Sequence, residues 1–114
     1  VVNYGLGART MLRKGDRPYW NEKLYQEALQ FNPDYVIIKF GTNDSKPHNW
    51  KYKEEFEKDY SDFIDSFAKL SSNPRIFICK PVPAYKLIWG IRDSIIVADI
   101  IPIIEKLGRE KKYK

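Results

Sequence analysis

The 114-residue sequence has one cysteine, one histidine and no long apolar run. The single Cys79 cannot form an internal disulfide, and its place in an apolar stretch favours a buried core thiol. One histidine and one cysteine at distant positions do not make a metal site, so we expect neither a metal nor a cofactor. No stretch reaches the ~18 apolar residues of a membrane-spanning helix, so we expect no membrane span.

What the sequence does contain is the composition of a folded domain. Apolar residues make up 43%, aromatic residues 15% and charged residues 31%, which argues against a disordered chain. The length allows one domain at most, residues 1–114. The net charge of +5 is scattered except for a basic cluster at 106–114, which we interpret as a solvated last helical turn rather than a nucleic-acid surface. Because the sequence begins at Val1 rather than Met, the lack of a signal peptide predicts no compartment.

Apolar periodicity predicts strands that alternate with helices, the pattern of an α/β fold with a parallel sheet. The expected buried strands cover 35–40 and 75–82, and residues 1–4 fit the end of another strand. The expected helices cover 19–30, 53–70 and 94–106. Pro102 falls inside the last helix and should kink it, because proline removes one backbone donor.

Three small polar residues, Thr42, Asn43 and Asp44, follow the strand at 35–40 and the turn residue Gly41. In an open α/β sheet, ligands bind in the crevice beyond the carboxyl ends of the strands. An asparagine amide in such a crevice can donate a hydrogen bond to an oxygen that gains negative charge during a reaction. The same residues also fit an Asx-turn in which Asp44 caps the local backbone, so the pattern alone leaves both roles open.

The segments around this point resemble, in order, those of the SGNH hydrolases, also called GDSL-type esterases and acylhydrolases. Gly-Thr-Asn-Asp at 41–44 resembles the third conserved block, and Asn3 to Thr10 resembles the second, commonly Asn-Phe-Gly-Val-Ser-Gly-x-Thr. The segments at 14–20, 45–50 and 80–85 resemble one bacterial branch of the family. The resemblance extends from Val1 to about Gly108 and implies a flavodoxin-like three-layer α/β/α fold with a parallel sheet, incomplete here.

Two blocks of the family have no counterpart in the sequence. The Gly-Asp-Ser motif of the nucleophile is absent, and so is the Asp-x-x-His arrangement of the general base. The only histidine, His48, does not match the family's base, and we interpret it as a loop residue. The missing first strand would be the central one, between 1–4 and 35–40, so its loss would leave backbone groups unpaired. We therefore expect a partial SGNH-hydrolase-like domain that is marginally stable or self-associating.

The resemblance also implies which residues form an oxyanion site. The family's donors are the N–H of the nucleophile, the N–H of the second-block glycine and the amide of the third-block asparagine, which Asn43 matches. Aligning Asn3 and Thr10 with the family pattern puts Ala8 at the glycine position and Gly7 at a position where serine is usual. Ala8 can still donate its N–H, but a positive φ would strain it.

Three further residues, Asp44, Arg9 and Tyr85, are candidate contacts to a substrate, and each has a structural alternative. Asp44 can orient Asn43 or cap a turn, and Arg9 can reach a polar substrate or face solvent. Tyr85, together with Trp89, can stack on a sugar ring or pack in the core.

Two hypotheses about function follow. The first is a fragment of a carboxylic-ester hydrolase whose complete form deacylates small esters, such as acetylated sugars or glycans, through an acyl-enzyme; the family branch suggests that substrate class. The second is a non-catalytic α/β relic, or a module that binds glycans or another protein chain. On either hypothesis the 114-residue chain should be inactive alone, because oxyanion donors without a nucleophile and base give weak acceleration at best.

Overall fold

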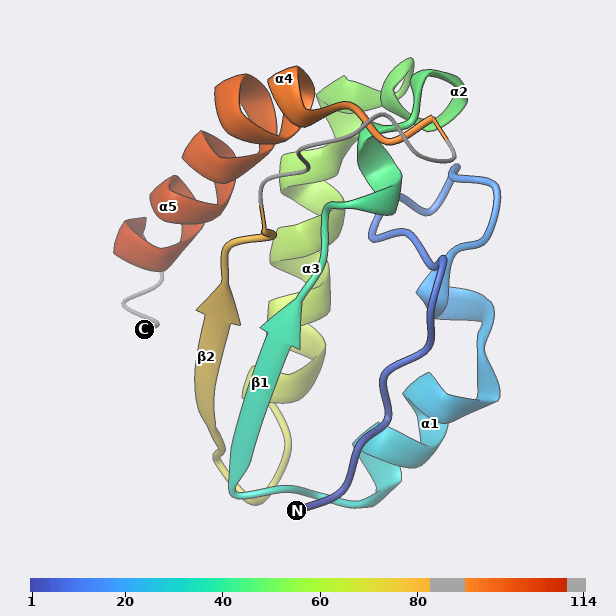
Figure 1. Cartoon of the computed structure of the whole chain (residues 1–114). Helices are drawn as coiled ribbons and strands as arrows, with labels where there is room; N and C mark the ends of the chain where they lie inside the picture. Colours follow the sequence, from blue (N-terminus) through green and yellow to red (C-terminus); the bar gives the residue numbers. More distant parts are fainter. Residues whose placement is uncertain (83–89, 111–114) are drawn as a thin grey trace.

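A two-stranded parallel sheet lies at the centre of the computed structural model, which describes residues 1–82 and 90–110 (Figure 1). Strand β1 (Tyr35–Lys39) pairs with β2 (Arg75–Cys79), in a register that sets Tyr35 opposite Arg75 and Lys39 opposite Cys79. Both strands are rich in β-branched and aromatic residues, which suit a pleated and half-buried surface. The incomplete parallel α/β fold expected from the sequence is thereby confirmed.

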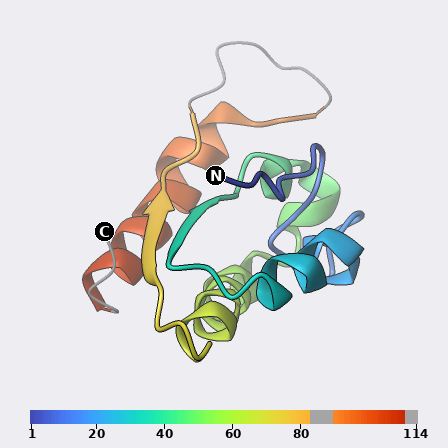
Figure 2. The ribbon, with the colours of Figure 1, turned by 90° about the horizontal axis from the view of Figure 1, so that it is seen from below.

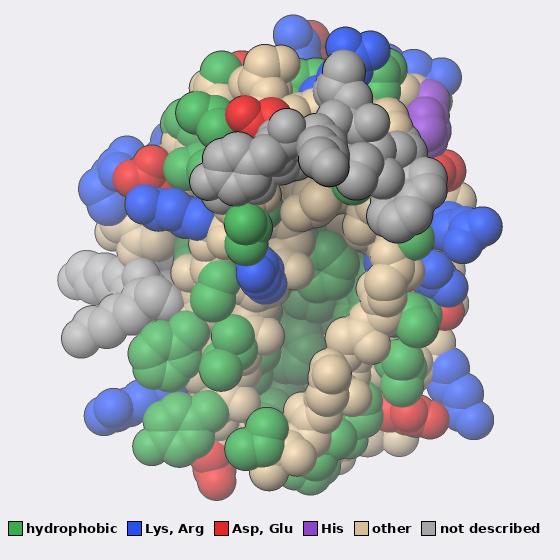
Figure 3. Space-filling view, viewed as in Figure 1, with side chains coloured by type: hydrophobic (Ala, Val, Ile, Leu, Met, Phe, Trp, Pro, Cys, Tyr) green, Lys and Arg blue, Asp and Glu red, His purple; other side chains and the backbone are tan. Residues whose placement is uncertain are grey.

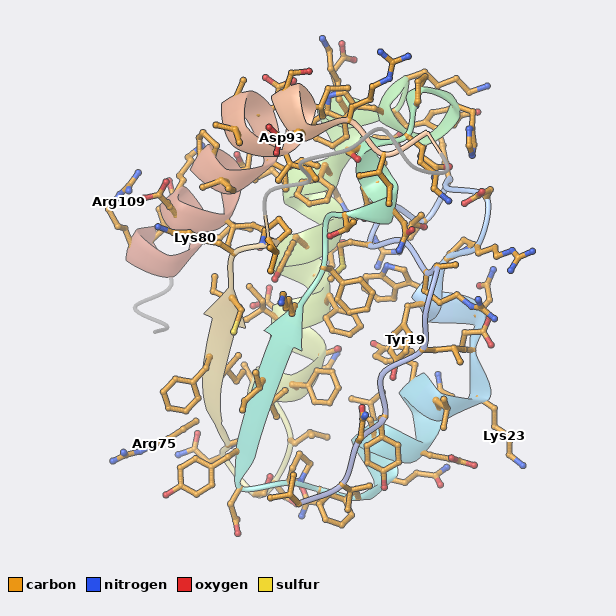
Figure 4. All side chains as sticks on the ribbon, in the orientation of Figure 1. Tyr19, Lys23, Arg75, Lys80, Asp93 and Arg109 are labelled. Atoms are coloured by element: carbon orange, nitrogen blue, oxygen red, sulfur yellow. The ribbon has the colours of Figure 1, made fainter. Side chains whose placement is uncertain are left out.

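Both strands end earlier than predicted. The second was expected to continue to Val82, but it ends at Cys79, just before Lys80 and Pro81. Pro81 has no N–H to donate to a ladder, which explains the early end. Lys80 instead points toward the C-terminal helix and pairs with Glu105 at 3.5 Å (Figure 4).

The helical segments match the predicted positions, but several are divided. The 3₁₀ turns are η1 (Tyr19–Asn21), η2 (Asn43–Ser45) and η3 (Lys53–Glu55). The α-helices are α1 (Lys23–Gln30), α2 (Pro47–Trp50), α3 (Phe56–Ala68), α4 (Asp93–Ile95) and α5 (Ile101–Glu110), and η4 (Ile96–Ile100) is a π-helical turn.

The π-helical turn is how the last helix accommodates Pro102. In η4 the Ile101 N–H donates to the Ile96 carbonyl, one residue further back than in an α-helix. Pro102 has no N–H, and its ring would crowd the carbonyl of Ala98. A widened turn directly before the proline relieves that crowding, so the predicted distortion appears as a π-bulge.

One face of the sheet carries the core. Val36 and Ile38 of β1 are buried, and α3 packs behind the strands with five buried apolar side chains: Phe56, Tyr60, Phe63, Ile64 and Phe67. Figures 1 and 2 both show α1 and α3 on this side of the sheet. The alternate residues Tyr35 and Ile37 point the other way and are 65% and 74% exposed. Among the described residues, no helix covers that second face.

Residues 1–4, expected to end a strand, are not in one. The N-terminal segment runs beside β1, and Figure 3 shows a hollow with apolar side chains on its floor between the two. Within the described residues, β1 pairs with a strand along one edge alone. Residues 1–4 have no neighbouring strand to accept and donate ladder hydrogen bonds, and this is the physical reason that they stay irregular.

Gly41 is a position where the fold tolerates no side chain. Its φ is +125°, and a Cβ there would lie 2.7 Å from Cγ2 of Ile100. Backbone strain and overpacking of this kind each cost about 1–3 kcal/mol, so we expect Gly41→Ala to lower the free energy of unfolding by ~2–4 kcal/mol. Urea denaturation measures the change. Gly7→Ala is the matched control, because no atom lies within 4 Å of a Cβ at Gly7; an equal loss in both variants would contradict this account.

The exposed strand face predicts self-association. An unpaired edge beside an apolar surface is a template for another strand. We expect sedimentation velocity to show concentration-dependent association, which Ile37→Lys reduces by placing a charge on the 74%-exposed position. Val97→Lys is the control, because Val97 is also exposed but lies in η4. A clean monomer with a sharp cooperative melt would show that the uncovered face does not drive association.

Candidate active site

The end of β1 and the turn that follows Asn3 meet in space, as the family resemblance implies. Gly41 ends the strand segment, and Asn43 begins η2 directly beyond it. The Nδ2 atom of Asn43 donates a hydrogen bond of 3.2 Å to the carbonyl oxygen of Arg9, the residue after Ala8. Two segments more than thirty residues apart thus place the Asn43 amide beside the Ala8 backbone.

Ala8 has a positive φ, the backbone conformation in which an alanine is strained. Its φ is +63°, the left-handed region that favours glycine. The residue is exposed, and its N–H has no hydrogen-bond partner among the described residues. The Ala8 N–H and the Asn43 amide, which binds the carbonyl of the next residue, are two donors from which a substrate oxygen could accept hydrogen bonds.

The Arg9 side chain stabilises this turn by hydrogen bonds. Its Nε donates to Glu22 at 2.8 Å, and its Nη1 donates to the carbonyl of Gly7 at 2.9 Å. The side chain is 19% exposed, so it lies against the turn rather than out in solvent. The contact to Gly7 fixes the backbone on one side of Ala8, which favours a supporting role for Arg9; contact with a substrate stays a prediction.

Asp44 is buried and holds the neighbouring backbone. Its carboxylate accepts hydrogen bonds from the N–H of Met11 at 3.1 Å and of Leu12 at 2.8 Å. Burial raises the pKa of Asp44 to about 6. Hydrogen bonds from the backbone N–H groups of Leu12, Met11 and Asp44 itself lower this pKa, but burial has the larger effect. A carboxylate with no exposed surface favours the structural alternative over contact with a substrate, which stays untested.

A second polar network holds Asn43 from the other side. The Nδ2 of Asn49 donates to the Asn43 carbonyl at 2.9 Å and to Asp16 Oδ1 at 3.1 Å, and its Oδ1 accepts the Asp16 N–H at 2.8 Å. Asp16 also contacts His48 Nε2 at 2.9 Å. Partial burial raises the pKa of Asp16, but the hydrogen bonds with His48 and Asn49 outweigh this and hold it below its usual value. Asn49 lies in the segment 45–50, which carries part of the family resemblance, but no role was predicted for it, because an asparagine in a polar loop looks like any other turn residue.

Tyr19 ties the N-terminal segment to the core. The side chain points inward from η1, as Figure 4 shows, and its hydroxyl donates to the carbonyl of Tyr4 at 2.7 Å. Burial raises the pKa of Tyr19 to about 12, so it stays a neutral donor. This hydrogen bond holds the N-terminal segment, which forms one side of the hollow beside β1.

Tyr85 and Trp89 fall outside the described residues. Over 1–82 and 90–110, no group of histidine, cysteine or acidic side chains could hold a metal ion, and no helix is long and apolar enough to cross a membrane. A surface depression of about 550 Å³ between α3 and α5 is lined mainly by charged side chains and contains none of the residues above.

The strain at Ala8 predicts a stabilising substitution. Ala8→Gly keeps the left-handed conformation but removes its steric cost of ~1–2 kcal/mol, and it loses about 0.4–1 kcal/mol because glycine raises the entropy of the unfolded chain. We expect a net gain in the free energy of unfolding of up to ~1.5 kcal/mol, measured by urea denaturation. Ala28→Gly, at a buried position inside α1, is the control and should destabilise. A loss of stability in Ala8→Gly would show that the turn is not strained.

The chain is similar to a curated protein described as an acetylxylan esterase, from Xylanibacter ruminicola. The two sequences are 42% identical over an alignment that covers 96% of this chain and 26% of the other protein. The chain therefore spans about a quarter of the length of the relative it matches. No model of a protein family matches the sequence, and no solved structure matches it.

Proposed function

We propose that the chain is part of a carboxylic-ester hydrolase of the SGNH type that removes acetyl groups from carbohydrates. The observation that carries the proposal is the meeting of the Asn43 amide with the turn at Ala8, where Asn43 Nδ2 lies 3.2 Å from the carbonyl of the next residue. Similarity to an acetylxylan esterase over nearly the whole chain supports both the esterase activity and the class of substrate.

In this proposal the chain supplies two donors for an oxyanion. A serine oxygen attacks the acetyl carbonyl, the carbonyl oxygen takes the negative charge, and the Ala8 N–H and the Asn43 amide stabilise it. The tetrahedral intermediate then breaks its bond to the sugar oxygen, which takes the proton that a base removed from the serine and leaves as a hydroxyl group. Water then hydrolyses the acyl-enzyme. The serine and the base belong to parts of a longer protein, since the 114 residues contain neither matching block.

The hollow beside β1 fits this proposal. The family resemblance places the strand that ends in the nucleophile between residues 1–4 and β1, where Figure 3 shows the hollow and its apolar floor. A strand running parallel to β1 in that position would bring its carboxyl end to the same edge of the sheet as Asn43. The three donors of the proposed oxyanion site would then lie together.

The alternative is a module that binds another protein chain without catalysis. The exposure of Tyr35 and Ile37 on an uncovered sheet face favours it, because apolar surface of this kind marks binding sites. The upstream coding sequence discriminates between the hypotheses: a strand followed by Gly-Asp-Ser supports the esterase, and its absence supports the binding module.

The esterase proposal predicts activity only in a longer protein. We expect p-nitrophenyl acetate to give a burst of acylation with the gene extended at both ends, and no turnover above background with the 114-residue chain. Asn43→Ala in the extended protein should lower kcat ~10²–10³-fold, the loss typical of one oxyanion donor.

Asn21→Ala is the matched control for Asn43→Ala, because Asn21 is exposed at the end of η1, and it should leave kcat unchanged. Melting temperatures of both variants separate catalysis from folding. Absence of a burst in the extended protein, or turnover by the short chain that Asn43→Ala abolishes, would overturn the proposal.

A further inference from the structure

We propose that Asp44 is a positioning residue: its carboxylate holds the segment after Ala8 against η2 and so sets the distance between the Ala8 N–H and the Asn43 amide. The inference rests on the proposed function, because these two groups are the proposed oxyanion donors. It assigns Asp44 no contact with a substrate.

The geometry of the two segments carries the inference. Asn43 and Asp44 are adjacent in η2, and both reach the same stretch of backbone: Asn43 Nδ2 donates to Arg9 O, and Asp44 accepts the N–H groups of Met11 and Leu12. The separate oxygens Oδ1 and Oδ2 each take one of these N–H groups. Two hydrogen bonds at different atoms prevent rotation of the segment about a single contact.

A neutral side chain of the same shape cannot replace this carboxylate. An asparagine at position 44 would offer one oxygen and one NH₂ group, and the NH₂ group would face either the Met11 or the Leu12 N–H, a donor opposed to a donor. Because the site has no exposed surface, water cannot satisfy the unpaired group. The segment would have to move to relieve the clash, and Ala8 lies three residues before Met11.

The electrostatic surroundings make this contact sensitive to protonation. Asp59 and Tyr60 of α3 face Asp44. Burial raises the pKa of Asp44 to about 6, and the charge of Asp59 adds to this rise. The Tyr60 hydroxyl has no hydrogen-bond partner among the described residues. Arg13 directly follows Leu12 in sequence and pairs with Asp59 at 2.9 Å. Protonation of Asp44 turns one acceptor oxygen into a hydroxyl group, so the hydrogen bond that this oxygen accepts from Met11 or Leu12 is lost while the cost of burying the charge is relieved.

The first test is an NMR titration of the wild-type chain. It does not depend on whether a substituted protein still folds. We expect the Met11 and Leu12 N–H signals to move with the titration of the Asp44 carboxyl, and the Ala8 N–H and the Asn43 side-chain amide to move with the same inflection. Signals of Ala8 and Asn43 that stay still while those of Met11 and Leu12 titrate would overturn the inference.

The second test compares Asp44→Asn with a matched control, Asp59→Asn. Asp59 is also a buried carboxylate that accepts a backbone N–H of the same loop, from Arg13 at 2.9 Å, but it lies on α3 rather than beside Asn43. In the 114-residue chain, Asp44→Asn should shift the Ala8 and Asn43 signals, and Asp59→Asn should leave them in place. Equal shifts in both variants would overturn the positioning role, because Asp44 and Asp59 would then stabilise the loop in the same way.

In the extended protein, Asp44→Asn should lower kcat by roughly 10–100-fold with little change in KM, the loss expected of a small misplacement of reacting groups. Asp59→Asn should keep kcat even at a similar loss of melting temperature. Equal losses of kcat would overturn the positioning role while the esterase stands. Absence of all esterase activity would overturn the proposed function, and the NMR comparison would still decide whether Asp44 positions Ala8.

Discussion

The carboxylate of Asp44 is the constraint on which the rest of this end of the molecule depends. A charge without exposed surface is unfavourable unless hydrogen bonds compensate it, and here the compensation comes from backbone N–H groups 32 and 33 residues away. The loop at 9–13 can therefore take its observed path only when η2 is in place. Asp59 accepts the N–H of Arg13, so the two buried carboxylates contact different parts of the loop, Asp44 the residues nearer to Ala8 and Asp59 the residue after Leu12.

This arrangement explains how a strained alanine persists. Ala8 at φ +63° costs free energy that a free turn would release by changing its conformation. Arg9 holds the Gly7 carbonyl on one side, and Asn43 and Asp44 hold the Arg9 carbonyl and the Met11 N–H on the other. The surrounding contacts fix the turn at both ends, so the strain is retained, and the Ala8 N–H makes no hydrogen bond to another described residue.

The sequence was informative where a feature depends on local pattern. The apolar run at 35–39 and the turn residue Gly41, which has positive φ, predicted a strand and its end. The same run predicted a strand buried on both faces, and this was wrong: Tyr35 and Ile37 are exposed, because no described helix covers that face. The placement of Asn43 beside the 5–8 turn was predicted through a family resemblance, not from the physics of the residues. Features that depend on distant partners were missed: the bonds of Asn49 to Asp16 and Asn43, and the early end of β2. The expected strand at 1–4 was wrong for the same reason, because a strand needs a neighbour and the described residues offer none there.

The candidate site and the sheet differ in whether contacts within this chain are enough to hold them in place. The hydrogen bonds from Arg9 to Gly7, from Asn43 to Arg9 and from Asn49 to Asn43 all lie within residues 7–49, so this chain's own hydrogen bonds preorganise the proposed donors. The sheet is the opposite case, since Tyr35 and Ile37 are exposed and one edge of β1 lacks a partner strand among the described residues. Preorganised dipoles stabilise charge because they need no rearrangement at the moment of reaction. An incomplete sheet can therefore coexist with a complete pair of donors, since the hydrogen bonds that fix the donors do not pass through the open edge.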